Sequence, residues 1–113
     1  MEQRTVAELA ARLAAAAKSN TPAPLLLDVR ENWEREIAAI EGSLNVVMNE
    51  VPDRLDDIRA AQGERELIVF CHTGKRSMVI ARFLLHNGFE RVANLDGGID
   101  AWSQHIDDAR HLY

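Results

Sequence analysis

The sequence is poor in cysteine and lacks long hydrophobic runs. Cys71 is the one cysteine among 113 residues, which excludes an internal disulfide and a paired-cysteine redox or zinc motif. No stretch reaches the roughly 18 consecutive apolar residues that a membrane-spanning helix needs. The four histidines lack the spacing of metal ligands on one helix face. We therefore expect a protein without metal or other cofactor and without a membrane partner.

Basic residues are fewer than acidic residues in this sequence. Lys and Arg number 13 against 18 Asp and Glu, which gives a net charge of −5 at pH 7. An acidic surface repels nucleic acid and anionic membranes, so neither is an expected partner. The alanine-rich N-terminal region carries Glu8, Arg12 and Lys18 among its apolar positions, which is not typical of a secretory signal peptide. These features favour a cytoplasmic protein.

Length and composition suit one domain. A chain of this length with 47% hydrophobic and 27% charged residues can bury a single core. No linker, internal repeat or low-complexity tract divides it. We expect residues 1–113 to form one domain that is a monomer or a weak dimer.

Apolar runs alternate with helical patterns along the chain. Strands are expected at residues 25–29, 44–47, 67–70 and 91–95, and helices at residues 5–18, 31–39, 51–62, 78–87 and 99–104. The first helix opens on Thr5 and Glu8, which match a capping box. Continuous apolar runs such as Leu25–Leu27 are typical of strands that are buried on both faces of a parallel sheet. The pattern predicts an α/β fold with a central, mostly parallel sheet flanked by helices.

Cys71 lies where the strand at residues 67–70 ends and a short polar loop leads into a helix. Unpartnered backbone N–H groups and the helix dipole stabilise negative charge at such a position, and Lys75 and Arg76 add two cations. Comparable surroundings lower the pKa of a thiol from about 8.5 to about 3.5–7.5. Cys71 is therefore a candidate nucleophile, although a free cysteine also serves as a small buried hydrophobic residue. The two cations form a local positive spot on an acidic protein, which suits a small anion.

Four segments, in this order and spacing, are similar to one known family. They are Leu27–Glu31 (LDVRE), Ile40–Asn45 (IEGSLN), Cys71–Ser77 (CHTGKRS) and Asn94–Trp102 (NLDGGIDAW). The chain resembles the rhodanese (sulfurtransferase) superfamily, as a single-domain member, and the resemblance runs from Leu25 to Trp102. The second segment departs from the family's usual Gly-His-Ile-Pro-Gly-Ala, because residues 39–43 lack the histidine and the proline.

Among proteins with the resembled fold, the length of the loop after the cysteine distinguishes sulfurtransferases from phosphatases. Four residues lie between Cys71 and Arg76, whereas cysteine-dependent phosphatases that share the rhodanese fold have five. The shorter loop suits a persulfide sulfur better than a phosphoryl group. The resemblance therefore implies a thiosulfate sulfurtransferase that moves a sulfane sulfur from thiosulfate or a persulfide donor, through a Cys71 persulfide, to a thiol or cyanide. Its expected partners are a small anionic sulfur donor and a thiol acceptor, either a small molecule or a protein thiol.

Two alternatives remain on the same fold. One is a persulfide carrier or partner-binding module without catalytic turnover. The other is a phosphatase or arsenate reductase, which the short loop disfavours.

The resemblance also implies roles for the residues of the loop. Cys71 is the nucleophile, and the substrate-binding residues are His72, Thr73, Gly74, Lys75, Arg76 and Ser77. Lys75 and Arg76 are candidates for binding the sulfonate oxygens of a donor, and the planar guanidinium of Arg76 is the better match. Ser77 either bonds the sulfur or caps the following helix. His72 either contacts the donor or a partner, or faces water.

Other polar residues are interpreted as structural. Asp28 and Arg30, a charged pair at the end of a buried strand, are expected to brace neighbouring loops. Residues 97–98 and Trp102 are assigned to a turn and to core packing. Glu34 is interpreted as part of a solvated helix face rather than as one of a pair of catalytic carboxylates.

Overall fold

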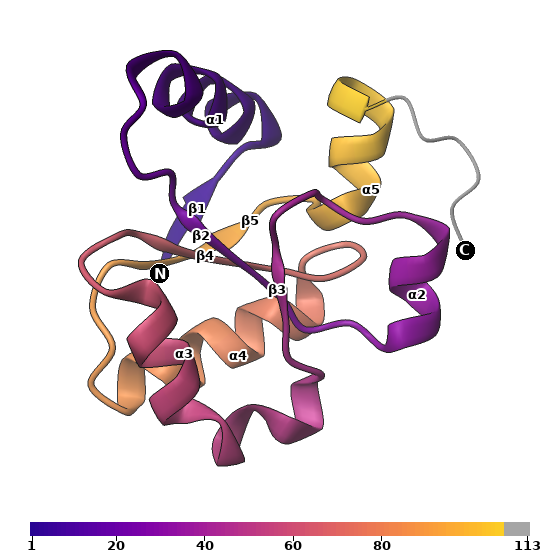
Figure 1. The fold of residues 1–113 in the computed structure, drawn as a ribbon. Coiled ribbons are helices and arrows are strands. Elements are labelled where there is room, and N and C mark those ends of the chain that lie inside the picture. Colours follow the sequence, from indigo (N-terminus) through magenta and orange to yellow (C-terminus); the bar gives the residue numbers. More distant parts are fainter. Residues whose placement is uncertain (108–113) are drawn as a thin grey trace.

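Five parallel strands form the central sheet of the computed structural model, which describes residues 1–107 (Figure 1). The strands lie in the order β1–β5–β4–β2–β3, and each neighbouring pair is parallel. Their bounds are β1 Glu2–Arg4, β2 Leu25–Asp28, β3 Leu44–Asn45, β4 Leu67–Phe70 and β5 Val92–Leu95. The predicted α/β fold with a central parallel sheet is confirmed.

Helices cover both faces of the sheet (Figure 1). One face carries α1 and α5, the other carries α3 and α4, and α2 lies at the end of the sheet where the strands finish. The bounds are α1 Val6–Ser19, α2 Asn32–Ile37, α3 Leu55–Gln62, α4 Lys75–His86 and α5 Gly98–Trp102. A 3-10 helix, Met48–Asp53, precedes α3, and a π-helical segment, Ser103–Asp107, follows α5. Within residues 1–107, no helix has the length and apolar character required to cross a membrane.

The capping residues of α1 explain where this helix begins. The Glu8 N–H donates a hydrogen bond to the Thr5 hydroxyl at 3.1 Å, and the Thr5 N–H donates to the Glu8 carboxylate at 3.4 Å. This capping box gives partners to N–H groups that the helix itself cannot satisfy. At the other end, Asn20 adopts a left-handed conformation with φ 54° and ends the helix. The predicted capping box is confirmed.

The two faces of the sheet contribute to two separate hydrophobic clusters. Leu27 and Val69 belong to the cluster that includes residues of α3 and α4, whereas Leu26 and Ile68 belong to the cluster that includes residues of α1 and α5. Because side chains alternate along a strand, burial on both faces requires a continuous apolar run. These four side chains are 3% exposed or less, and each contributes about 1.5–3 kcal/mol through burial. The prediction that the central strands are buried on both faces is confirmed.

Several element boundaries differ from the predictions. β1 was missed because Glu2–Arg4 has no apolar pattern, yet it pairs with β5 as a short polar edge strand. The helix predicted at residues 51–62 begins at Leu55, because residues 51–53 belong to the 3-10 helix. α4 begins at Lys75 rather than at residue 78, because Gly74, with φ 109°, turns the chain directly from the loop into the helix. β3 is also shorter than predicted, at 2 residues.

Asp28 and Arg30 form a buried ion pair at the carboxyl end of β2. The guanidinium donates to the Asp28 carboxylate at 2.9 and 2.7 Å, and the Arg30 backbone N–H donates to it at 3.0 Å. The same guanidinium donates to the carbonyl oxygens of Glu34 at 3.3 Å and Ala38 at 2.8 Å. Neither side chain of the pair is exposed. The pair therefore ties α2 to the end of the sheet.

We expect Asp28→Ala to lower the free energy of unfolding by about 3–5 kcal/mol, because the variant removes the carboxylate that is paired with the buried Arg30 guanidinium. Urea unfolding followed by circular dichroism measures the loss. Asp57→Ala is the matched control, since Asp57 pairs with Arg54 on the surface and its side chain is 65% exposed. The control should lose less than about 1 kcal/mol. Equal losses in the two variants would contradict a bracing role for the buried pair.

Candidate functional site

The loop that follows β4 folds around the sulfur of its first residue, Cys71. This residue is 1% exposed. The Gly74 N–H donates to Cys71 Sγ at 3.2 Å, and the Ser77 N–H and hydroxyl each lie 3.4 Å from Sγ. These groups belong to the N-terminus of α4, where the helix dipole also favours negative charge. The loop therefore forms an anion-binding nest of N–H groups centred on the sulfur.

Opposing effects act on the pKa of the Cys71 thiol. Burial raises the pKa, because the thiolate loses contact with water. Hydrogen bonds from the Ser77 hydroxyl and from the backbone N–H groups of Ser77, Gly74 and Arg76 lower it. The hydrogen bonds prevail, and the pKa lies below the ordinary value of a cysteine thiol. Since the thiolate is the nucleophilic form, the lowered pKa increases the reactive fraction of Cys71 at a given pH.

Gly98 holds the backbone of the loop in place. The Ile99 N–H donates to the Cys71 carbonyl at 2.9 Å, and the Asp100 N–H donates to the His72 carbonyl at 2.9 Å. A β-carbon at Gly98 would collide with both of these carbonyl oxygens, and the residue has φ 56°. Only glycine allows so close an approach between the start of α5 and the Cys71 loop.

The Ser77 side chain faces the sulfur and does not cap α4, whose N-cap is Gly74. Its Oγ also lies 2.5 Å from Asn94 Oδ1, and one hydroxyl proton cannot serve both acceptors at once. The Asn94 amide donates to the Gly74 carbonyl at 3.3 Å and to Gln3 Oε1 at 3.1 Å, which sets its orientation. Asn94 is a site residue that the sequence analysis did not single out. The sequence indicates this residue by a polar amide side chain within the otherwise apolar strand β5.

Arg76 is paired with a buried carboxylate from α2. Its two terminal nitrogens donate to the Glu34 carboxylate oxygens at 2.8 and 2.7 Å. The Glu34 side chain is 3% exposed, whereas that of Arg76 is 36% exposed. The interpretation of Glu34 as a solvated residue was therefore wrong. The error arose because the helical pattern does not show that α2 packs against the Cys71 loop.

The remaining residues of the loop differ in exposure. Thr73 and Lys75 are exposed, and His72 is half-buried. The structure thus places Gly74 and Ser77 against the sulfur, while Thr73 and Lys75 lie at the outer surface of the loop. Among residues 1–107, no group of three or more His, Cys, Asp or Glu side chains is arranged to hold a metal ion.

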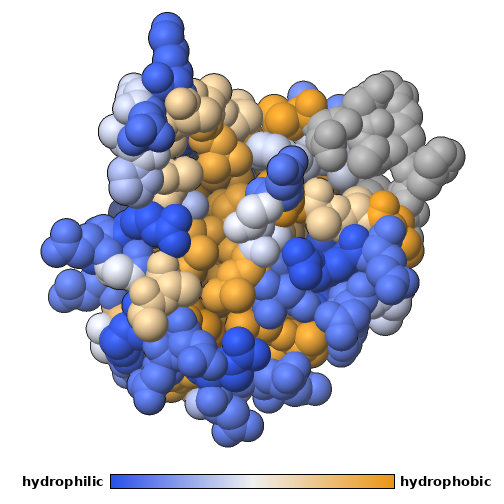
Figure 2. Space-filling view, viewed as in Figure 1, coloured by the Kyte–Doolittle hydropathy of each residue, from blue (hydrophilic) through white to orange (hydrophobic). Residues whose placement is uncertain are grey.

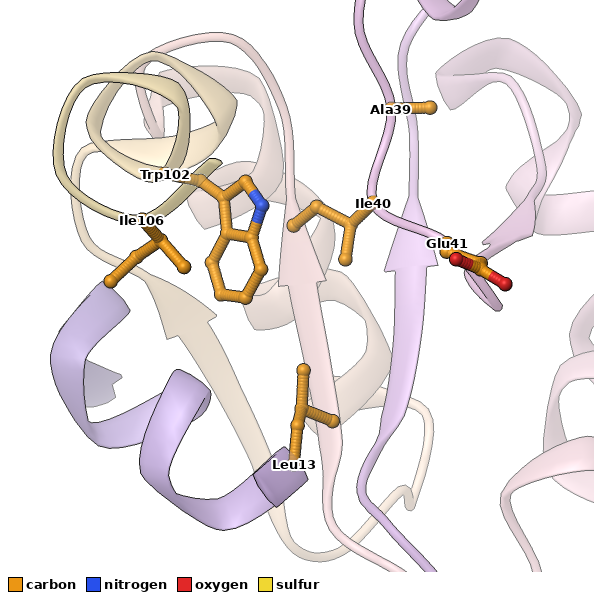
Figure 3. A pocket seen from close by; sticks show the side chains of 6 residues that line it. All are labelled: Leu13, Ala39, Ile40, Glu41, Trp102 and Ile106. Carbon is orange, nitrogen blue, oxygen red and sulfur yellow. The ribbon is translucent and has the colours of Figure 1, made fainter. Parts of the chain in front are cut away.

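A pocket of about 370 Å³ lies apart from the Cys71 loop, between α1 and α5 (Figure 3). Figure 2 shows a band of hydrophobic residues running between these two helices. The pocket is lined by Leu13, Ala39, Ile40, Glu41, Trp102 and Ile106. Ile40 and Glu41 belong to the segment that departs from the usual sequence of the resembled family. None of the lining residues belongs to the Cys71–Ser77 loop, so the pocket is separate from the candidate nucleophile.

We expect Ser77→Ala to raise the pKa of the Cys71 thiol, because the variant removes a hydrogen-bond donor to the thiolate. The rate of alkylation by iodoacetamide, measured against pH, rises as the thiolate forms, so its midpoint should move to higher pH. Thr73→Ala removes an exposed hydroxyl from the same loop and should leave the midpoint unchanged. An unshifted midpoint in Ser77→Ala would show that the hydroxyl does not stabilise the thiolate.

We expect Gly98→Ala to destabilise the protein more than Gly88→Ala. Both glycines have a positive φ, so both variants carry backbone strain of about 1–3 kcal/mol. A β-carbon at Gly88 meets no atom within 4 Å, whereas one at Gly98 collides with the Cys71 and His72 carbonyl oxygens. Thermal unfolding compares the stabilities, and iodoacetamide alkylation reports the Cys71 loop. Equal melting temperatures and unchanged alkylation would contradict the proposed role of Gly98.

Comparison with known proteins agrees with this fold. The family model of the rhodanese-like domain matches residues 5–112. A protein named sulfurtransferase from Allochromatium vinosum is 33% identical over 87 residues, which cover 77% of this chain and 78% of the relative. The thiosulfate sulfurtransferase GlpE of Tolumonas auensis is 28% identical over 99 residues, which cover 88% of this chain and 84% of the relative.

A solved structure shows the same architecture. The crystal structure of a rhodanese-like domain protein from Staphylococcus aureus superposes with a TM-score of 0.77 at 25% identity. The superposition covers 90% of this chain and 91% of the other. With a matching family model over nearly all of its length, a similar sulfurtransferase and this shared fold, the chain belongs to the rhodanese-like domain family.

Proposed function

We propose that the protein is a sulfurtransferase that carries a sulfane sulfur as a persulfide on Cys71. The observation that carries the proposal is the convergence of the Gly74 and Ser77 N–H groups on Cys71 Sγ. Relatives named sulfurtransferase, including a thiosulfate sulfurtransferase, support a transferase. Thiosulfate is the proposed donor, with a persulfide as the other candidate.

In the first step, the Cys71 thiolate attacks the outer sulfur of thiosulfate. A bond forms between Cys71 Sγ and that sulfur, the bond to the sulfonate sulfur breaks, and its electron pair leaves with sulfite. The products are a Cys71 persulfide anion and sulfite, so the total charge of −3 is conserved. Sulfite is a stable anion that needs no proton from the protein. The N–H groups of the loop stabilise the terminal sulfur of the persulfide because they are oriented before the reaction.

In the second step, an acceptor thiolate attacks the terminal sulfur of the persulfide. The new sulfur–sulfur bond forms on the acceptor, and the electron pair of the broken bond restores the Cys71 thiolate. Because the chain holds no second cysteine, the acceptor has to come from outside, as cyanide does in an assay or a thiol in a cell. Transfer through a covalent intermediate should give ping-pong kinetics. A thiol that has to remain reduced also favours the cytoplasm as the site of action.

We assign the charged residues of the loop to attracting the sulfur donor. Lys75 is exposed at the first turn of α4, and Arg76 is partly exposed beside it. We propose that Lys75 attracts the sulfonate oxygens while the outer sulfur approaches Cys71, and that Arg76, which is paired with Glu34, lines the same approach. His72 and Thr73 complete the proposed substrate-binding loop.

The test is the intact mass of the protein after incubation with thiosulfate and desalting without reductant. We expect a gain of one sulfur atom in the wild type and no gain in Cys71→Ser. Cyanide added to the loaded protein should remove the extra sulfur and release thiocyanate. Loading without release to cyanide or to any thiol would instead favour a persulfide carrier.

If the protein gains no sulfur, a second measurement tests the phosphatase alternative. A folded protein with reduced Cys71 that gains no sulfur from thiosulfate or from a persulfide would contradict sulfur transfer. Hydrolysis of a phosphate ester by that same sample would then favour the phosphatase alternative.

A further inference from the structure

The Glu34 carboxylate is held rigidly where it meets the Cys71 loop. It accepts a hydrogen bond from the Glu31 N–H at 2.8 Å in addition to the two from Arg76. The carbonyl group of Glu34 accepts from the Arg30 guanidinium at 3.3 Å. With 3% of its side chain exposed, Glu34 cannot turn away into water without breaking these contacts. The negative charge beside Arg76 is therefore a fixed part of the site.

This placement changes what Arg76 can offer to a substrate. A guanidinium that makes two parallel hydrogen bonds to a carboxylate has used the donor edge that best matches a sulfonate. Its positive charge is also largely compensated at short range by the carboxylate. A dianion that approaches the loop then meets a nearly neutral ion pair rather than an open cation. Lys75, which is exposed, remains to attract the donor.

We infer that Glu34 is a specificity-determining residue that acts through Arg76, by compensating the guanidinium charge and so reducing the preference of the site for doubly charged sulfur donors. This inference rests on the proposed function. It makes Glu34 a positioning residue, because its contacts are to Arg76 and not to the reacting sulfur. Compensation of the Arg76 charge weakens the attraction of the site for donors with two negative charges more than for donors with one.

Glu34→Gln tests the inference, because the amide keeps the size of the side chain and can still accept from the Glu31 N–H. Two donors are compared. Thiosulfate carries two negative charges, and methanethiosulfonate carries one and releases methanesulfinate when its outer sulfur is attacked. The ratio of kcat/KM for thiosulfate to that for methanethiosulfonate should rise about three- to fivefold in the variant, as expected for one additional partly exposed ion pair. Added salt should reduce this gain.

Glu36→Gln is the matched control. It removes the same charge from α2 at an exposed position, and it should change the ratio by much less. An equal rise in both variants would show an effect of overall charge and would overturn the inference. A fall in kcat/KM for both donors by the same factor in Glu34→Gln would also overturn it, since that pattern indicates a merely structural role.

The double variant Glu34→Gln/Arg76→Gln keeps the test decisive if Glu34→Gln fails to fold. It removes both members of the pair and leaves no unpaired charge. If the pair is already compensated, the ratio should stay within about twofold of the wild type. A drop of about tenfold or more would show that Arg76 binds the sulfonate directly despite Glu34, and would overturn the inference. Failure of the wild type to accept sulfur from either donor would count against the proposed function instead, so the two failures are distinct.

Discussion

Arg30 brings a permanent positive charge into the interior, and the groups that surround this charge organise one end of the sheet. A guanidinium does not lose its proton in a protein, so a buried one requires a counter-ion and acceptors for its N–H groups. Asp28 provides the counter-ion, and the carbonyl oxygens of Glu34 and Ala38 provide further acceptors. The need to satisfy one buried charge therefore holds α2 against the sheet. That same placement delivers the Glu34 carboxylate to Arg76 in the Cys71 loop.

The sulfur of Cys71 is a second buried group whose charge depends on its surroundings. Burial raises the pKa of the Cys71 thiol, and hydrogen bonds from the Ser77 hydroxyl and from N–H groups at the start of α4 outweigh this effect and lower the pKa. Supports for the loop come from three elements. Asn94 in β5 donates to the Gly74 carbonyl, Gly98 in α5 admits the Cys71 and His72 carbonyl groups, and Glu34 in α2 holds Arg76. They meet because the carboxyl ends of parallel strands lie at one edge of the sheet (Figure 1).

Most of the fold was predictable because its signals are local. The apolar runs of β2 and β4 and the capping box of α1 each lie within a few residues of what they specify. β1 was missed because a short polar edge strand derives its strand character from its partner, and its pairing of Gln3 with Asn94 joins distant parts of the chain. Glu34 was misjudged for a related reason. A helix of six residues is too short for its periodicity to reveal that one carboxylate points inward.

The sequence by itself determined the alternation of buried strands and helices, and it placed a lone cysteine at a strand end beside a glycine-containing loop. These features depend on side-chain period, capping and backbone freedom, which are properties of neighbouring residues. Only the tertiary structure decided the partners of the polar groups: Arg76 with Glu34 across 42 positions, Ser77 with Asn94 across 17, and Asn94 with Gln3 across 91. The physical reason is that a buried charge or amide bonds to whichever group the packing brings within reach, and residue type alone does not specify that group.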